Sequence, residues 1–160
     1  MPAPSERLFA RVFLAMSLLF APLNAYALTE TADQPLSAYR DKNRVLLVFT
    51  PSEKDAAYTE QGRLWQSERA GFEERQLVVV PVLADAARAA GDTPGALQKK
   101  YGIEPKTFAV VLLGKDGHDA YRASRPVKGA SLYEVIDSMP MRKDEMKRQR
   151  SSTTKAHHDE

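Results

Sequence analysis

The sequence predicts a single α/β domain, in which a mixed β-sheet is covered by helices on both faces. Two continuous apolar runs, "RVLLVFT" (Arg44 to Thr50) and "TFAVVLL" (Thr107 to Leu113), are typical of strands buried on both sides. Segments with helical spacing lie between and after the strands. The chain has 160 residues, 43% hydrophobic and 28% charged, which is ordinary for one globular domain.

The first strand, Arg44 to Thr50, is followed by a segment with helix-start residues. Ser52 is the expected N-cap, with Asp55 three residues later, and the helix should run to about Ala70 and stop at Gly71. The second strand is "QLVVVPVLAD", residues 76–85. Pro81 cannot donate a ladder hydrogen bond, so we expect a bulge or a locally open edge there.

A short second helix and a hairpin follow. Asp92 and Pro94 suit a helix start, and Gly102 suits its end. After the third strand, the loop Lys115 to Gly117 predicts a hairpin in which Gly117 takes the left-handed conformation and forms a bulge. The fourth strand is then residues 118–124.

The last part of the domain is helical. Ser131 and Glu134 form a predicted capping box, and Pro140 ends that helix and can begin another. The resulting order is strand, helix, strand, helix, hairpin, helix. The first two strands should therefore be parallel, and the hairpin adds two antiparallel strands. One face of the last helix is expected to be apolar, with Leu132, Val135, Ile136 and Met139.

The N-terminal stretch has the pattern of a secretory signal. Arg7 and Arg11 precede a short apolar run, residues 12–23, and "AYA" ends at Ala27. We interpret residues 1–27 as a cleavable signal peptide, 28–35 as a flexible lead-in, 36–150 as the domain and 151–160 as a disordered tail. An uncleaved anchor or a buried core helix is the alternative. The expected location is periplasmic or secreted after cleavage following Ala27, with no stable membrane anchor.

Charge and cysteine content exclude several classes of function. Removing Arg7, Arg11 and Glu6 leaves 21 basic and 20 acidic residues, so the exported chain would carry +1 and gives no case for nucleic acid. The chain has no cysteine, which excludes thiol redox chemistry and thiolate metal sites. His157, His158 and Asp159 could bind a metal, but a disordered tail offers no fixed geometry. We therefore expect no metal and no cofactor.

Local motifs resemble those of thioredoxins. "YGI" (Tyr101 to Ile103) stands at the end of the second helix, "FAVVLLGKDG" resembles the central hairpin, and "VKGASLYEVID" resembles the start of the last helix. The resemblance implies a thioredoxin-like mixed sheet flanked by helices. Thioredoxins carry a cysteine pair after the first central strand and a cis-proline before the third. Here these places read "TPSEKDAAY" and "KTF", so the resemblance does not extend to oxidoreductase or peroxidase activity.

A closer resemblance covers nearly all of the exported chain. "NRVLLVF", "GKDG", "LYEVIDSMPMR" and "EM" (Glu145 and Met146) are similar to a secreted domain-of-unknown-function family. That family occurs in bacterial exported proteins, in equarin and in sushi-repeat-containing extracellular proteins, where it has been described as peroxiredoxin-like. The resemblance implies an extracytoplasmic setting and brings no established activity.

The first candidate site is the position where thioredoxins have their cysteines. Ser52 lies at a helix start, where it is a possible nucleophile or anion ligand, or simply a cap. A serine nucleophile needs a base, and the expected topology puts His118 at the opposite edge of the sheet. Glu53 and Asp55 are the carboxylates that an enzyme would use here. The vacant redox position comprises Thr50, Pro51, Ser52, Glu53 and Asp55.

The second candidate site joins the hairpin turn to the end of the last helix. Chain direction brings the two motifs together, and we expect Asp116 to pair with Arg142 and Lys115 to pair with Asp137 or Glu145. Met139 and Met141 should pack under the hairpin. A structural clamp without a ligand is the alternative. The candidate surface comprises Gly114, Lys115, Asp116, Gly117, Asp137, Met139, Pro140, Met141 and Arg142.

Two further patterns remain open. The basic residues of "MRKDEMKRQR" suit contact with an anionic membrane or partner, or a solvated helix face. Met139, Met141 and Met146 suit an adaptable binding surface or ordinary packing. The favoured function is a redox-inactive binding or interaction module for an unknown periplasmic or extracellular protein. The alternatives are a cysteine-independent enzyme and a domain that supports a partner complex.

Overall fold

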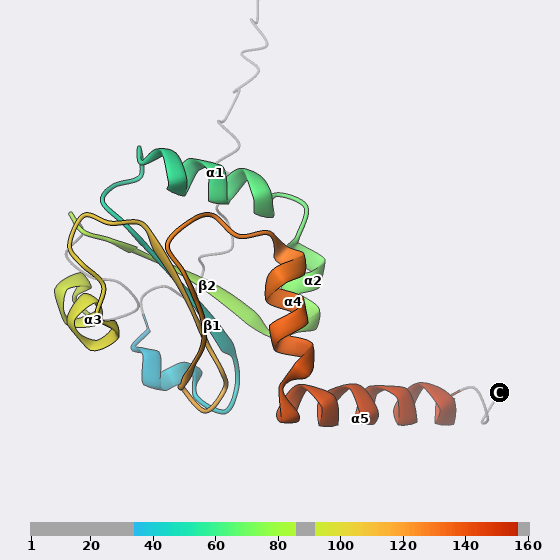
Figure 1. Cartoon of the computed structure of the whole chain (residues 1–160). Coiled ribbons are helices and arrows are strands. Elements are labelled where there is room, and N and C mark those ends of the chain that lie inside the picture. Colours follow the sequence, from blue (N-terminus) through green and yellow to red (C-terminus); the bar gives the residue numbers. More distant parts are fainter. Residues whose placement is uncertain (1–33, 86–91, 157–160) are drawn as a thin grey trace, which may run out of the picture.

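The computed structural model describes residues 34–85 and 92–156. Its centre is a four-stranded mixed sheet, as the sequence predicts (Figure 1). The strand order is β2-β1-β3-β4. The first two strands are parallel, and both other pairs are antiparallel. The strands are β1 (Arg44–Thr50), β2 (Leu77–Leu83), β3 (Ala109–Leu113) and β4 (Asp119–Ala123).

Helices cover both faces of the sheet. The 3₁₀ helix η1 (Leu36–Tyr39) and α3 (Pro94–Tyr101) pack on one apolar cluster, which includes Val45 and Leu47 of β1. The other cluster includes Leu46 and Val48 and lies under three helices. All seven residues of β1 are buried, because its side chains alternate between the two cores. The three helices are α1 (Ala56–Trp65), α2 (Arg69–Glu74) and α4 (Gly129–Ser138).

The expected turn chemistry is confirmed. Gly102 ends α3 with φ 65°, and Gly117 is the last residue of the hairpin loop, with φ 81°. The pairing of β3 with β4 shifts between Leu112 and Leu113, which is the expected bulge. Pro81 lies on the edge strand β2, but its pairing with β1 continues without a register shift, so the proline causes no bulge.

The helix after β1 differs from the prediction. Asp55, not Ser52, is the N-cap, since its Oδ1 accepts a hydrogen bond from Tyr58 N at 3.0 Å. The helix ends at Trp65, and a separate α2 contains Gly71 instead of stopping there. Gly71 has a packing role: a methyl group at this position would clash with the Tyr133 hydroxyl of α4. The glycine thus allows α2 and α4 to approach closely.

The predicted capping box at Ser131 is wrong. Helix α4 begins two residues earlier at Gly129, and its N-cap, Lys128, makes no side-chain capping bond. The preceding Val127 is held by the buried Gln61 amide. Gln61 Nε2 donates to Val127 O at 2.7 Å, and Val127 N donates to Gln61 Oε1 at 2.8 Å. This long-range pairing fixes where the chain enters the helix.

The last helix, α5 (Pro140–Ala156), begins at Pro140 as predicted and extends away from the end of α4 (Figure 1). Helix continues through Ala156, although disorder was expected from Ser151. Its hydroxyls bond back to the helix backbone; Ser151 Oγ, for example, donates to Lys147 O at 3.0 Å. No helix within 34–85 and 92–156 is long and apolar enough to cross a membrane. Residues 1–27 and 157–159 lie outside the described residues.

Candidate functional site at the GKDG end of the sheet

The two candidate sites lie at opposite ends of the sheet. Val45 pairs with Leu113 at one end, and Phe49 pairs with Ala109 at the other. The GKDG turn therefore lies beside the start of β1, and Thr50 lies at the far end. We call the first region, residues 114–117 and the side chains packed around them, the GKDG end. The second, residues 50–55, is the β1 carboxyl end. Ser52 and His118 are on different ends, as expected.

The GKDG turn is closed by its own hydrogen bonds. Gly114 N donates to His118 O at 2.9 Å, and Gly117 N donates to Gly114 O at 2.9 Å. The Asp116 carboxylate accepts from His118 N at 3.1 Å and lies 3.4 Å from His118 Nδ1. The side chain of Asp116 thus stabilises the turn itself.

A segment from the N-terminal side of β1 holds the outside of this turn. Arg40 donates to the Asp116 carbonyl oxygen from Nη2 at 2.8 Å and from Nε at 3.1 Å. Asp41 N donates to Lys115 O at 2.8 Å. Asp41 has φ 63°, which is uncommon outside glycine, so the chain accepts local strain where it meets the turn.

Glu145 of α5 is the centre of a buried ion cluster on the α4 side of the sheet. Arg44 is 0% exposed and donates to both Glu145 oxygens, at 3.2 and 3.3 Å. Lys115 of the turn lies 2.7 Å from Glu145 Oε1. Lys115 also donates to Gln76 Oε1. One carboxylate therefore ties β1, the hairpin turn and α5 together.

A second ion cluster lies beside the first. Arg142 is 1% exposed; its Nη2 donates to Glu74 Oε1 at 2.5 Å and its Nε to Asp137 Oδ1 at 3.2 Å. Arg75 binds the same Asp137 with two nitrogens, at 3.1 and 2.7 Å. The Arg75 guanidinium also lies 4.0 Å from the centre of the Tyr133 ring. This cluster joins the end of α2 to the junction of α4 and α5.

Gln76 connects the clusters to the start of β2. Its φ of 49° is in the left-handed region, which a glutamine seldom adopts. Gln76 O accepts a hydrogen bond from Arg44 N at 2.9 Å, while its side chain accepts from Lys115. Both contacts are to residues that bind Glu145, so the cluster holds the main chain and the side chain of Gln76.

The clusters favour the charged forms of their carboxylates. Burial acts to raise the pKa of Glu145, but hydrogen bonds from Lys115 and Arg44 outweigh it and lower the pKa. Burial likewise opposes a lowered pKa at Asp137, where the bonds from Arg75 and Arg142 prevail. Both groups are therefore ionised counter-ions at neutral pH and not poised acids.

The structure confirms one expected pair and corrects two contacts. Lys115 pairs with Glu145, so the GKDG turn and the start of α5 do meet. Arg142 does not pair with Asp116: Glu74, Asp137 and Glu145 surround it, whereas Asp116 faces His118. Met139 is half-buried against the α4-side core, but Met141 is 45% exposed and does not pack under the hairpin. Pro140 starts α5 between them.

The β1 carboxyl end is a capped helix start. Thr50 Oγ1 donates to Ser52 O at 2.9 Å, and Asp55 N donates to the same carbonyl at 3.2 Å. The Asp55 carboxylate is occupied by Tyr58 N. Glu53 is exposed and Pro51 is half-buried. The polar groups of this region therefore bond mainly to one another.

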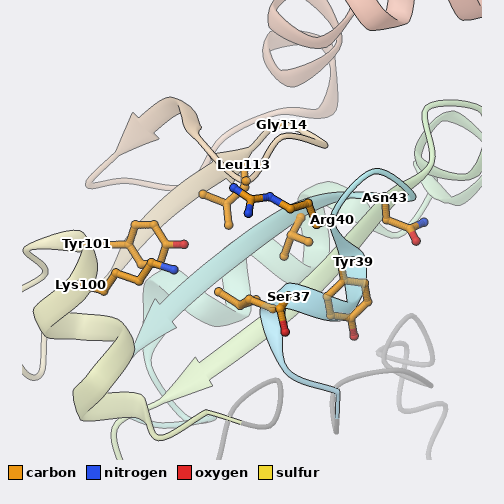
Figure 2. A pocket seen from close by; sticks show the side chains of 11 residues that line it. Ser37, Tyr39, Arg40, Asn43, Lys100, Tyr101, Leu113 and Gly114 are labelled. Atoms are coloured by element: carbon orange, nitrogen blue, oxygen red, sulfur yellow. The ribbon is translucent and has the colours of Figure 1, made fainter.

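A pocket opens on the other face of the GKDG turn. It lies between η1, α3, the start of β1 and the end of β3. Its volume is about 150 Å³. Val45 and Leu113 form part of an apolar floor, while Arg40 and Lys100 bring positive charge. Figure 2 shows the Tyr101 hydroxyl directed toward Leu113 and the Arg40 guanidinium, with the Lys100 ammonium beside the Tyr101 ring. Gly114 and Gly117 of the turn complete the wall.

Sequence reasoning located this end of the sheet but missed most of the side chains that build it. The sequence predicts Arg44 and Gln76 each as the first residue of a strand, and Arg75 carried no motif. Arg40 and Lys100 carried no motif, because their proximity depends on η1 and α3 packing on the same face. The position of Arg44 at the start of the apolar strand β1 was the one signal in the sequence for a buried ion pair. Within the described ranges, no three His, Asp or Glu side chains are grouped so that they could hold a metal ion.

Fold and site together define a thioredoxin-like α/β domain that lacks a thiol centre. The family described as "Domain of unknown function (DUF4174)" matches residues 35–145, and the chain belongs to this family. A solved structure, the reduced 2-Cys peroxiredoxin of Plasmodium vivax, has a TM-score of 0.55 and 14% identity, over 68% of this chain and 84% of that one. This likeness shows the fold alone.

Curated relatives include sushi-repeat-containing proteins. The chain is 32% identical over 135 residues to SRPX of Rattus norvegicus, covering 79% of this chain and 29% of the relative. The human SRPX is 31% identical over the same shares. SRPX2 of Xenopus laevis is 26% identical, over 64% of this chain and 24% of the relative. The chain thus spans less than a third of the length of these relatives.

Proposed function

We propose that the chain is an exported, redox-inactive binding module and that its GKDG end forms the binding region. The observation that carries the proposal is the pocket beside the turn, which combines an apolar floor with Arg40 and Lys100. Such a combination of apolar surface and a few convergent polar groups is typical of ligand sites. On the opposite face of the turn, the buried Lys115–Glu145 ion pair ties this region to α5.

The rival function is an enzyme that uses carboxylates at the β1 carboxyl end. Asp55 is committed to capping α1, and Glu53 is exposed at the surface. A carboxylate that works as a general acid needs a sheltered position that raises its pKa. The exposure of Glu53 and the capping bond of the half-buried Asp55 support the binding module over the enzyme.

Export fits the proposed role. The pattern of residues 1–27 is that of a cleavable signal peptide, and cleavage would follow Ala27. The absence of cysteine suits a domain that requires no oxidative folding in the periplasm or outside the cell. The expected partner is a ligand or protein of that compartment. N-terminal sequencing of the chain purified from the periplasm or medium of an expressing cell tests the cleavage.

A map of ligand contacts tests the binding region. The exported chain, labelled with ¹⁵N, is titrated with a library of small polar and apolar compounds, and its amide shifts are followed. We expect the responding amides to gather around Tyr101, Gly114 and Gly117. Shifts confined to residues 50–55, together with turnover in a hydrolase screen that Glu53→Gln or Asp55→Asn abolishes, would overturn the proposal.

A further inference from the structure

We infer that the pocket beside the GKDG turn binds a small organic carboxylate with an apolar body, about as large as a single six-membered ring. This inference rests on the proposed function and names its ligand class. Four features of the pocket carry it: its charge, its apolar floor, its size and a buried hydroxyl that has no partner.

The charge of the pocket selects an anion. Arg40 and Lys100 line it, and none of the described residues that line it is acidic. Arg40 uses Nε and Nη2 to bind the Asp116 carbonyl oxygen, which fixes the direction of its guanidinium. A guanidinium has five donors, so Arg40 retains N–H groups for a carboxylate. Lys100 adds a second cation from α3, 5.3 Å from the centre of the Tyr101 ring.

The Tyr101 hydroxyl supplies an independent sign that a ligand belongs here. Tyr101 is 6% exposed, and its buried oxygen has no hydrogen-bond partner within the described part of the chain. A buried hydroxyl without a partner costs free energy, so native proteins seldom retain one without a reason. The hydroxyl is directed into the pocket, toward Leu113 and the Arg40 guanidinium (Figure 2). A carboxylate oxygen of the ligand would accept its proton.

Size and lining set the body of the ligand. The pocket measures about 150 Å³. An apolar protein cavity of similar volume holds one benzene molecule. Leu36, Val45 and Leu113 offer aliphatic surface, and Tyr39 and Tyr101 offer ring surface. Inorganic phosphate would meet the cations but leave this apolar surface uncovered, so the pocket should prefer an organic anion.

The probe is benzoate, and benzamide is its uncharged counterpart of the same shape. Amide shifts of the ¹⁵N-labelled exported chain are followed during titration with each compound and with inorganic phosphate. We expect a benzoate dissociation constant on the order of 1 mM, as suits a ligand of so few atoms. Benzamide and phosphate should each bind at least about fivefold more weakly, because one lacks the charge and the other lacks the apolar body.

Matched variants locate the site. Lys100→Gln should weaken benzoate binding about fivefold, whereas Lys99→Gln, which makes the same charge change at the preceding exposed position of α3, should leave it within twofold. Tyr101→Phe should weaken binding several-fold while leaving the melting temperature unchanged or raised, because the variant removes a hydroxyl that the unliganded protein leaves without a partner.

Each outcome decides the inference. If benzamide binds as tightly as benzoate, the inferred preference for an anion is wrong. If phosphate binds more tightly than benzoate, the inferred need for an apolar body is wrong. Equal effects of Lys99→Gln and Lys100→Gln would place benzoate outside the pocket. If benzoate does not bind, the inferred ligand class is wrong, whereas the proposed binding region stands as long as other compounds shift the amides around Tyr101 and Gly117.

Discussion

The two ends of the central sheet use polar residues in different ways. At the β1 carboxyl end, Thr50, Ser52 and Asp55 form short local bonds that start a helix. At the GKDG end, Arg44, Lys115 and Glu145 come from three distant segments and form a buried ion cluster. Local bonds cap one element, while long-range ion pairs fix several elements relative to one another. The comparison teaches that the end where thioredoxins carry their chemistry is here the structurally simpler one.

Removing Glu145 should have the largest effect on stability. Glu145→Ala leaves Arg44 and Lys115 buried near each other without their counter-ion, which should cost about 3 kcal/mol of unfolding free energy. Urea unfolding followed by circular dichroism measures the loss. Glu134→Gln, at an exposed position of α4, is the control and should change stability by less than about 0.5 kcal/mol. A similar cost for both variants would mean that the cluster is not a clamp.

Low pH should also lower the free energy of unfolding, by less than Glu145→Ala, because protonation neutralises the same carboxylates. The pKa values of Glu145 and Asp137 are lowered from their ordinary values of 4.5 and 3.8. Their contribution to stability is therefore complete above about pH 4.5 and is lost as the pH falls through the lowered values. Urea midpoints measured from pH 7 to pH 3 should fall steeply below pH 4.5. Glu145→Gln should flatten that fall; an unchanged slope would show that other carboxylates cause it.

The backbone of the turn should tolerate substitution less well than the backbone of α3. Gly117→Ala places a side chain at φ 81° and should cost about 1–2 kcal/mol. Gly95→Ala is the matched control, because open space surrounds that helical position, and it should stabilise the protein by about 0.5–1 kcal/mol. Thermal unfolding should show a lower melting temperature for Gly117→Ala and a higher one for Gly95→Ala. A stabilising Gly117→Ala would contradict the assigned turn conformation.

The β1 carboxyl end should show the smallest effects. Asp55→Ala removes the cap of α1 and should cost about 1 kcal/mol. Ser52 contributes its carbonyl and not its hydroxyl to the described bonds, so Ser52→Ala should change stability by less than about 0.5 kcal/mol. Urea unfolding of the two variants shows whether Asp55 or Ser52 caps α1. A larger loss for Ser52→Ala would restore serine as the cap.

Sequence patterns predicted the elements whose causes are local. The apolar runs of β1 and β3, the left-handed Gly117 and the helix restart at Pro140 follow from side-chain period and backbone preference. The prediction at Ser52 was wrong because a nearby residue won a local competition, and those at Gly71 and Ser131 were wrong because distant contacts decided them. Asp55 competed successfully for the cap, Tyr133 packed on Gly71, and Gln61 fixed the backbone of Val127.

The sequence alone determined the fold class, the absence of thiol chemistry and the meeting of the GKDG turn with the start of α5. Each follows from composition or from the order and direction of the strands. Only the tertiary structure decided which charges pair and where a pocket opens. Arg142 binds Glu74 instead of Asp116, and Arg40 and Tyr101 line one pocket although about 60 residues separate them in the chain. Such choices depend on side-chain reach and burial across elements far apart in the chain, which no local pattern encodes.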